Sequence, residues 1–253
     1  DWAPSDPCLT VLYPDRSVEV EFRCRQELLW TGRWELDIRR DGRPVRPEGD
    51  WEEICWVSDA DADYLELQMA FEGGLRVQRH LFLAKEDDLL LLADAILGDR
   101  PASLEYRGLL PLADGISFQP AGETREGYLK GRRRLALALP LALPEWRADP
   151  RGLELRQQGQ GRSMFAPLCF DLRPGRMTCP FTWRKLAIAQ SLEVQPDDVA
   201  VGYRVMIGRE QWLLYRALAS KGYRTLLGHN LVSEMLVARF DRSGEVEPLV
   251  EIE

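Results

Sequence analysis

Histidine and lysine are scarce in this sequence of 253 residues, and no familiar catalytic motif is present. His80 and His229 are its two histidines, and only 4 of its 33 basic residues are lysine. Two histidines are too few for a histidine-rich metal site. The sequence contains no glycine-rich loop of the kind that binds phosphates or dinucleotides. It also has no His-Glu-x-x-His motif of zinc proteases and no Gly-x-Ser-x-Gly motif around a nucleophilic serine. We therefore expect no cofactor and no metal ion, and no local sequence supports a Ser-His-Asp triad.

Paired cysteines and long apolar runs are also lacking. The five cysteines are odd in number and include no Cys-x-x-Cys pair, which excludes a complete disulfide framework and argues against zinc. Cys24 lies on the apolar side of an alternating segment, so we expect a buried free thiol. Leu89–Ala93 ends at Asp94, and Pro140 interrupts Leu135–Leu143. No segment therefore approaches the roughly 20 residues of a membrane span.

The overall charge argues against nucleic acid as a partner. Acidic residues number 41 and basic residues 33, which gives a net charge of -8. Binding to phosphates requires a concentrated basic face, and the one basic run, Arg132–Arg134, is short. We interpret this run as a solvated entrance to a strand.

Apolar and charged residues alternate with a period of two, which is typical of half-buried strands. The pattern is clear over residues 18–25 and 34–39, and Asp41-Gly42 then forms a dipeptide favoured in tight hairpins. Residues 65–71 and 75–83 alternate on either side of Gly73-Gly74. This pair of segments predicts a hairpin.

Leu89–Ala93 is apolar on both faces, as in a central strand that is covered on both sides. Gln211–Ser220 fits either a helix or a strand. About a dozen strands with few helices predict one all-β domain over residues 1–253, a large antiparallel two-sheet sandwich. Further strands are predicted over residues 104–110, 134–139, 153–157, 164–172, 181–189, 200–207, 232–240 and 246–252.

One candidate site lies near the second histidine. His229 or Tyr215 is the predicted base of an acid–base reaction, Arg216 would bind a substrate carboxylate, and Glu234 would orient the base. The same segment contains Arg224 and Asn230 as predicted ligand-binding residues. The alternative is that residues 228–230 form only a polar turn between two strands.

Two clusters combine tryptophan with charged residues. They are Glu145-Trp146-Arg147 and Trp183-Arg184, and Trp51 and Trp56 flank Cys55 in a similar way. Indole rings stack on the apolar faces of sugars while charged groups bind the hydroxyls, so these are predicted carbohydrate ligands. The alternative is that each tryptophan closes one end of the sandwich.

Two further features have simple interpretations. His80 shares a strand face with Gln78 and Phe82, and we expect a histidine on the polar face, with ligand binding or acid–base chemistry as the alternative. The alternating aspartates of residues 59–63 could bind a hard cation, but the glycine and distal glutamate of a calcium loop are absent. We interpret them as an acidic turn.

Residues 79–83 and 87–96 resemble a stretch in the β-sandwich domain of heparinase II/III-like polysaccharide lyases. In both, a strand that bears an arginine turns through an acidic loop into an apolar strand that ends in Asp and a small apolar residue. The resemblance covers roughly 30 residues and implies a two-sheet super-sandwich. The family's α-helical toroid is absent here, and its base and neutralising residue do not map onto this chain.

Three functions remain open. The first is a carbohydrate-associated β-sandwich module that binds acidic polysaccharide or oligosaccharide. The second is a polysaccharide lyase or sugar epimerase. The third, suggested by the start at Asp1 rather than methionine, is a structural or interaction domain of a larger protein. The expected partners are accordingly carbohydrate or other domains of the same assembly.

Overall fold

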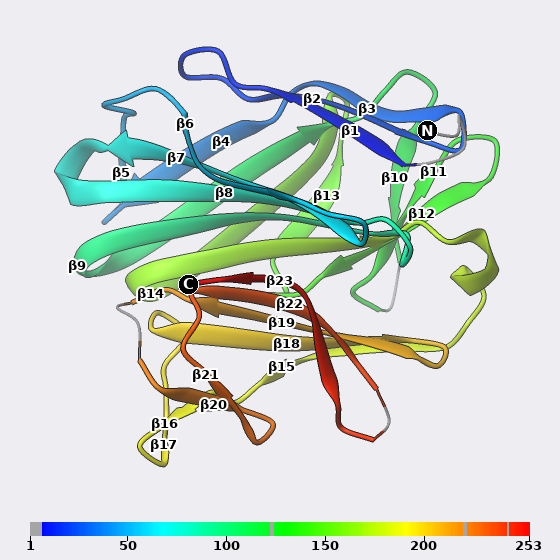
Figure 1. Ribbon diagram of the computed structural model, residues 1–253. Coiled ribbons are helices and arrows are strands. Elements are labelled where there is room, and N and C mark those ends of the chain that lie inside the picture. Colours follow the sequence, from blue (N-terminus) through cyan, green and yellow to red (C-terminus); the bar gives the residue numbers. More distant parts are fainter. Residues whose placement is uncertain (1–6, 122–123, 220–221, 242) are drawn as a thin grey trace.

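The computed structural model describes residues 7–121, 124–219, 222–241 and 243–253, and these are almost entirely strands and turns (Figure 1). Their helical content is two three-residue 3-10 turns, η1 (Glu72–Gly74) and η2 (Pro174–Arg176). Nothing helical in these ranges could therefore cross a bilayer. The predicted all-β fold is confirmed.

An eleven-stranded antiparallel sheet dominates the molecule. Its main path runs β10-β11-β12-β14-β9-β8-β7-β6, while β13 pairs with β14, β4 with β9 and β5 with β4. The strands are β4 (Glu35–Arg40), β5 (Arg43–Pro44), β6 (Glu52–Ser58), β7 (Ala62–Phe71), β8 (Leu75–Ala84), β9 (Leu89–Pro111), β10 (Ser117–Pro120), β11 (Gly127–Lys130), β12 (Arg134–Pro140), β13 (Glu145–Asp149) and β14 (Gly152–Asp171).

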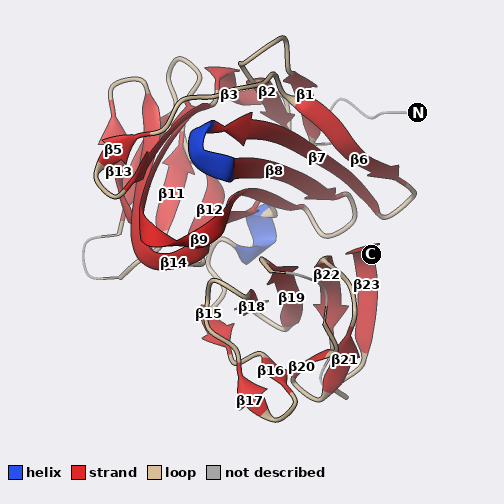
Figure 2. Ribbon diagram, turned by 90° about the vertical axis from the view of Figure 1, so that its left-hand side faces the viewer, coloured by secondary structure: helices blue, strands red, loops and turns tan. Residues whose placement is uncertain are grey.

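The two longest strands, β9 and β14, bend sharply and pair along almost their whole length (Figure 2). Sequence patterning predicted each as two separate strands. The prediction was wrong at the middle of β14, where the polar and glycine-rich residues 158–161 suggest a turn. They instead stay paired with β9, and a bulge between Gly161 and Ser163 absorbs the bend.

A second, five-stranded sheet packs against the large one, as Figure 1 shows. Side chains such as Leu91 and Phe165 of the large sheet meet Val205, Trp212 and Val237 of the second sheet in a shared apolar core. The predicted antiparallel two-sheet sandwich is confirmed. The strands of the second sheet, in spatial order, are β15 (Phe181–Leu186), β18 (Ala200–Ile207), β19 (Glu210–Ala217), β22 (Met235–Phe240) and β23 (Val246–Ile252).

Two small sheets complete the fold. One packs Phe22 and Trp30 against Leu67 and Phe170 of the large sheet. It consists of β1 (Cys8–Leu12), β2 (Glu19–Cys24) and β3 (Glu27–Arg33). The other consists, in spatial order, of β17 (Glu193–Val194), β16 (Ala189–Gln190), β20 (Arg224–Leu226) and β21 (His229–Leu231).

Most local predictions hold. Gly73 joins β7 to β8 with a φ of 72°, and Asp41 and Gly42 join β4 to β5 with φ values of 53° and 74°. Cys24 is a buried free thiol, and residues 132–134 form the exposed entrance to β12. The ambiguous segment Gln211–Ser220 is a strand over residues 211–217 of β19, which is buried on both faces; Ser220 lies outside the described residues.

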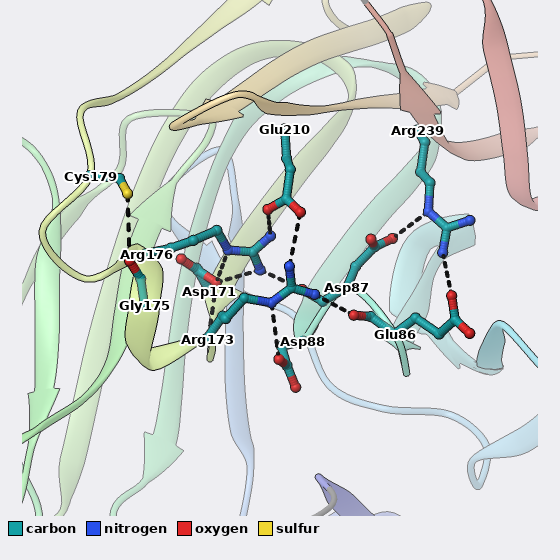
Figure 3. A network of polar contacts seen from close by, with 10 residues as sticks. All are labelled: Glu86, Asp87, Asp88, Asp171, Arg173, Gly175, Arg176, Cys179, Glu210 and Arg239. Carbon is teal, nitrogen blue, oxygen red and sulfur yellow. Dashed lines mark hydrogen bonds and ion pairs between the residues drawn. The ribbon is translucent and has the colours of Figure 1, made fainter.

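A network of ion pairs ties the two main sheets together at one end (Figure 3). Arg176 contacts Asp171 of β14, with an Nε–Oδ1 distance of 3.0 Å, and also pairs with Glu210 of β19. Arg173 donates to Glu210 at 2.8 Å, and Arg239 of β22 bonds Asp87 between β8 and β9 at 3.0 Å. Charge pairs therefore link the two sheets at this end of the sandwich.

Candidate functional site

A groove of about 1130 Å³ opens between the large sheet and the edge of the five-stranded sheet. Its large-sheet side is formed by residues 156–160 and 163–165 of β14, and its other side by residues 181–185 of β15 with Val201 and Tyr203 of β18. Residues 141–145 border it as well. We call this the inter-sheet groove.

Trp183 is the aromatic centre of the inter-sheet groove. It lies on β15, the edge strand of its sheet, and packs half-buried against the apolar core between the two sheets. The Phe181 and Trp183 rings are nearly parallel, with centroids 6.3 Å apart. Arg184 and Lys185 follow on the same strand and are exposed. This side of the groove therefore offers an indole next to two cations.

Amides and balanced charges line the rest of the groove. The Nε2 of Gln157 donates to the carbonyl of Phe165 at 3.0 Å, and this bond orients the glutamine. Lys185 pairs with Asp197, and Asp198 accepts from the backbone N–H of Arg162 at 2.9 Å. The lining holds four cationic and four anionic side chains. Its chemistry suits hydroxyl groups together with single charges.

Only some residues of the two predicted tryptophan clusters line this groove. Glu145 lines it together with Trp183 and Arg184. Trp146 instead packs edge-on against Phe118, with ring centroids 4.5 Å apart, on the other face of β13. Arg147 bonds Glu154 of β14. Glu145 and Trp146 are neighbours on β13 and point to opposite faces of the strand, so Trp146 packs into the core layer while Glu145 lines the groove.

The four predicted catalytic residues do not converge. Tyr215 is buried against the small sheet of β16, β17, β20 and β21, whereas Arg216 bonds Gln78 of the large sheet, on the opposite face of β19. His229 lies edge-on to Phe240, with ring centroids 6.4 Å apart. Glu234 precedes β22. Tyr215 and Arg216 are adjacent residues of one strand and face opposite layers, so these four described side chains do not share one cleft.

The predicted ligand residues Arg224 and Asn230 lie outside the inter-sheet groove. Arg224 is buried and donates from Nη1 to the hydroxyl of Tyr215 at 3.2 Å. Asn230 is exposed on β21, where its Oδ1 accepts from the hydroxyl of Thr225 at 3.3 Å. Both belong to the β20–β21 hairpin, and neither lines the groove.

His80 is fully buried, so the prediction of a polar-face histidine was wrong. Its face of β8 is covered by the five-stranded sheet, and Nδ1 lies 2.8 Å from the hydroxyl of Tyr64. That hydroxyl also donates to Glu66 at 2.7 Å. Burial and the nearby charge of Arg216 hold the pKa of His80 well below its ordinary value. The two-residue alternation of the sequence predicted which face of β8 carries His80, but not that the five-stranded sheet covers that face.

A second cavity, of about 900 Å³, went unnoticed in the sequence. Trp34, Trp51 and Tyr106 contribute to its lining, around the buried guanidinium of Arg79. Six arginines but only three carboxylates line it, in a protein of net charge -8. It shares residues 156–158 of β14 with the inter-sheet groove. Of the flanking pair predicted beside Cys55, Trp51 belongs to this cavity and Trp56 is exposed elsewhere.

The aspartates of residues 59–63 form a turn between β6 and β7, as predicted. Asp59 accepts from the backbone N–H groups of Asp61 and Ala62, each at 2.8 Å, and Asp63 pairs with Lys85. Within the described ranges, no group of three or more His, Cys, Asp or Glu side chains is arranged to hold a metal ion.

Comparison with known proteins gives a likeness of fold. No protein-family model and no curated protein sequence matches the chain. Among solved structures, heparan sulfate lyase HepC from Pedobacter heparinus superposes with a TM-score of 0.56 at 10% identity, and a HepC mutant with 0.55 at 11%. Each match covers 86% of this chain and 42% of the lyase. At such identities the conclusion is that the chain shares the fold of a part of these lyases.

Proposed function

We propose that this chain is a carbohydrate-associated β-sandwich module that binds acidic oligosaccharide in the inter-sheet groove. One observation carries the proposal: Glu145, Trp183 and Arg184, expected from two separate segments to bind sugar, line the same groove. An indole can stack on a sugar ring while amides and charged groups bind its hydroxyls and carboxylate. The lyase fold of the structural neighbours supports a carbohydrate context.

Calorimetric titration with a panel of uronic-acid oligosaccharides tests the proposal. We expect heat from at least one member at millimolar ligand, and Trp183→Ala should weaken that binding about tenfold, as expected for loss of a central aromatic contact. Trp56→Ala is the matched control, because Trp56 is 57% exposed and lines neither cavity. No heat with any member, or equal losses in the two variants, would overturn the proposal.

The interaction-domain alternative requires a broad apolar patch and no pocket with polar groups. Exposed apolar side chains do gather near β16, β17, β20 and β21, namely Leu192, Val194, Tyr223 and Leu227. The described residues nevertheless form two cavities with polar linings. We therefore prefer the binding module. The enzyme alternative is less favoured, because Tyr215 and Arg216 face opposite layers.

A further inference from the structure

One buried carboxylate holds three arginines at the junction of the two cavities. Glu154 of β14 is 1% exposed and accepts from the Nε atoms of Arg107, Arg147 and Arg156 at 2.6, 2.9 and 2.9 Å. We call these three side chains the arginine triad. Each arginine donates to Glu154 through its Nε, so these bonds leave its two terminal nitrogens available for other acceptors.

Strand register brings the arginine triad together. Arg147 of β13 lies directly opposite Glu154, and Arg156 lies directly opposite Arg107 of β9. Residues opposite each other in paired strands share a face, and residues two apart on one strand also share it. The cluster is therefore built into three paired strands of the sheet and does not depend on a loop.

The arginine triad has terminal nitrogens that its neighbours do not use. Asp37 accepts from Nη1 of Arg107 at 2.9 Å, and Glu145 lies directly opposite Arg156 on the paired strand β13. Among the described residues, the terminal nitrogens of Arg147 and Arg156 have no protein acceptor, and these side chains are 61% and 51% exposed. They present unused, positively charged donors to solvent.

Glu154 keeps this arrangement fixed. Burial alone would raise its pKa, but hydrogen bonds from Arg107 and Arg156, together with the charges of Arg107 and Arg147, outweigh burial and hold the pKa below its ordinary value. The carboxylate therefore stays ionised at neutral pH and anchors the guanidinium groups. Anchored donors lose little conformational entropy when an anion binds.

Arg156 places the triad beside both cavities. It lines the inter-sheet groove and also the second cavity, and Arg107 lines the second cavity. Arg147 lines neither cavity, but the shared carboxylate of Glu154 holds it next to Arg156. A ligand that occupies the groove can therefore place a negative group at Arg156.

We propose that Arg107, Arg147 and Arg156 form an anion-binding site that holds the carboxylate or sulfate group of an acidic saccharide. The terminal nitrogens of Arg147 and Arg156 supply the forked donors that match a planar carboxylate or two oxygens of a sulfate. The saccharide part of this inference rests on the proposed function, whereas the affinity for an oxyanion does not.

The test compares R147Q and R156Q with R151Q in calorimetric titrations. Arg151 lies in the same hairpin, is 56% exposed and lines neither cavity, and it pairs with Asp149 and with Glu35, which lines the second cavity. The probes are a galacturonate hexasaccharide, a carrageenan hexasaccharide that carries only sulfate, and uncharged cellohexaose. These arms separate carboxylate from sulfate and both from neutral sugar.

R147Q and R156Q should each weaken binding of the preferred charged probe about tenfold, as for loss of a charge-assisted hydrogen bond, and R151Q by less than about twofold. Binding of cellohexaose should not change. Thermal melting of each variant checks that it remains folded. Equal losses in all three variants, or unchanged affinity in both R147Q and R156Q, would overturn the anion site.

Inorganic sulfate separates the two proposals. Sulfate titrated at constant ionic strength should shift the Nε–Hε NMR signals of Arg147 and Arg156 to saturation and leave that of Arg151 in place. If no acidic oligosaccharide binds but sulfate still gives these shifts, the proposed function fails and the anion site stands. If sulfate shifts none of them, or Arg151 equally, the anion site is wrong.

Discussion

Arg79 and Asp94 form a buried, bidentate ion pair between neighbouring strands. The Nε–Oδ1 and Nη2–Oδ2 distances are 2.8 and 2.9 Å, and the two residues lie directly opposite each other on β8 and β9. The guanidinium carbon of Arg79 lies 3.8 Å from the centre of the Trp34 ring, and the hydroxyl of Tyr106 donates to Asp94 at 2.8 Å. The resemblance segment of the sequence thus contains both members of one buried pair.

Removal of Arg79 should strongly destabilise the protein. Arg79→Met leaves the charge of Asp94 buried without its partner, and we expect the free energy of unfolding to fall by about 3–5 kcal/mol in urea titrations at pH 7. Arg23→Met is the control, because Arg23 and Glu21 form an exposed pair that should contribute about 1 kcal/mol or less. Similar losses in the two variants would contradict the role of burial.

Removing both charges of the Arg79–Asp94 pair should cost less unfolding free energy than removing Arg79 alone. In Arg79→Met/Asp94→Leu both charges are removed, so neither is left buried alone. We expect this double variant to unfold at a higher urea concentration than Arg79→Met, since apolar replacements of a buried pair are often tolerated. A double variant less stable than the single one would show that the hydrogen bonds of Asp94 matter more than its charge.

Stability should depend on pH through His80. The hydroxyl of Tyr64 donates its single proton to Glu66, so Nδ1 of His80 is the donor to that oxygen. The lowered pKa of His80 keeps the imidazole neutral at pH 7. Among the described residues, Nε2 of His80 has no partner that could accept a second proton. Protonation would place a cation in a buried layer close to Arg216.

The sign of this dependence follows from the lowered pKa of His80. Below about pH 6.5 the unfolded chain binds a proton at this histidine while the folded protein does not, so stability falls as the pH decreases. The wild type should lose stability relative to His80→Asn by up to about 1.4 kcal/mol per pH unit. Urea titrations at pH 7, 6 and 5 measure the difference, and a constant difference would contradict it.

Thiol reactivity should follow the layers of the sandwich. Cys24 and Cys169 are buried, and burial raises the pKa of both thiols, so they should not react with Ellman's reagent in the native protein. Cys8 is exposed and should react first, ahead of the half-buried Cys55 and Cys179. All five should react in guanidinium chloride. Rapid reaction of five thiols without denaturant would contradict this packing.

The ionic contacts between the main sheets should differ greatly in strength. Asp171 is 0% exposed and pairs with Arg176, so Asp171→Asn should cost about 3 kcal/mol of unfolding free energy. Glu210, whose side chain is 44% exposed, pairs with the same arginine, and Glu210→Gln should cost less than about 1 kcal/mol. Chemical denaturation of both variants makes the comparison. A larger loss for Glu210→Gln would reverse the assigned order.

Strands and turns that depend on residues close together in the sequence could be predicted. Residues 18–24 reveal strand β2 because their positions alternate between water and an apolar layer. Residues 75–83 alternate in sequence, but β8 is buried on both faces apart from Arg76. Gly73 and Asp41-Gly42 mark their turns because left-handed backbone favours such residues. The continuity of β14 was not predictable, since its polar middle is held by pairing with β9.

The candidate site was predictable only in part. Trp146 and Trp183 look alike in the sequence, each next to an arginine, yet Trp183 lines the groove and Trp146 packs against Phe118. Glu154 gave no signal, because its three arginine partners come from strands β9, β13 and β14. Local pattern defines two faces of each strand but carries no information about which partner strands meet there.

The sequence by itself determined the all-β class, the main hairpins and the burial of Cys24, because these depend on residues a few positions apart. Only the tertiary structure decided that His80 is buried, that Tyr215 and Arg216 face different layers, and that three arginines surround Glu154. The physical reason is that strand alternation is a local property. The layer that covers each face, and the charges it carries, come from distant parts of the chain.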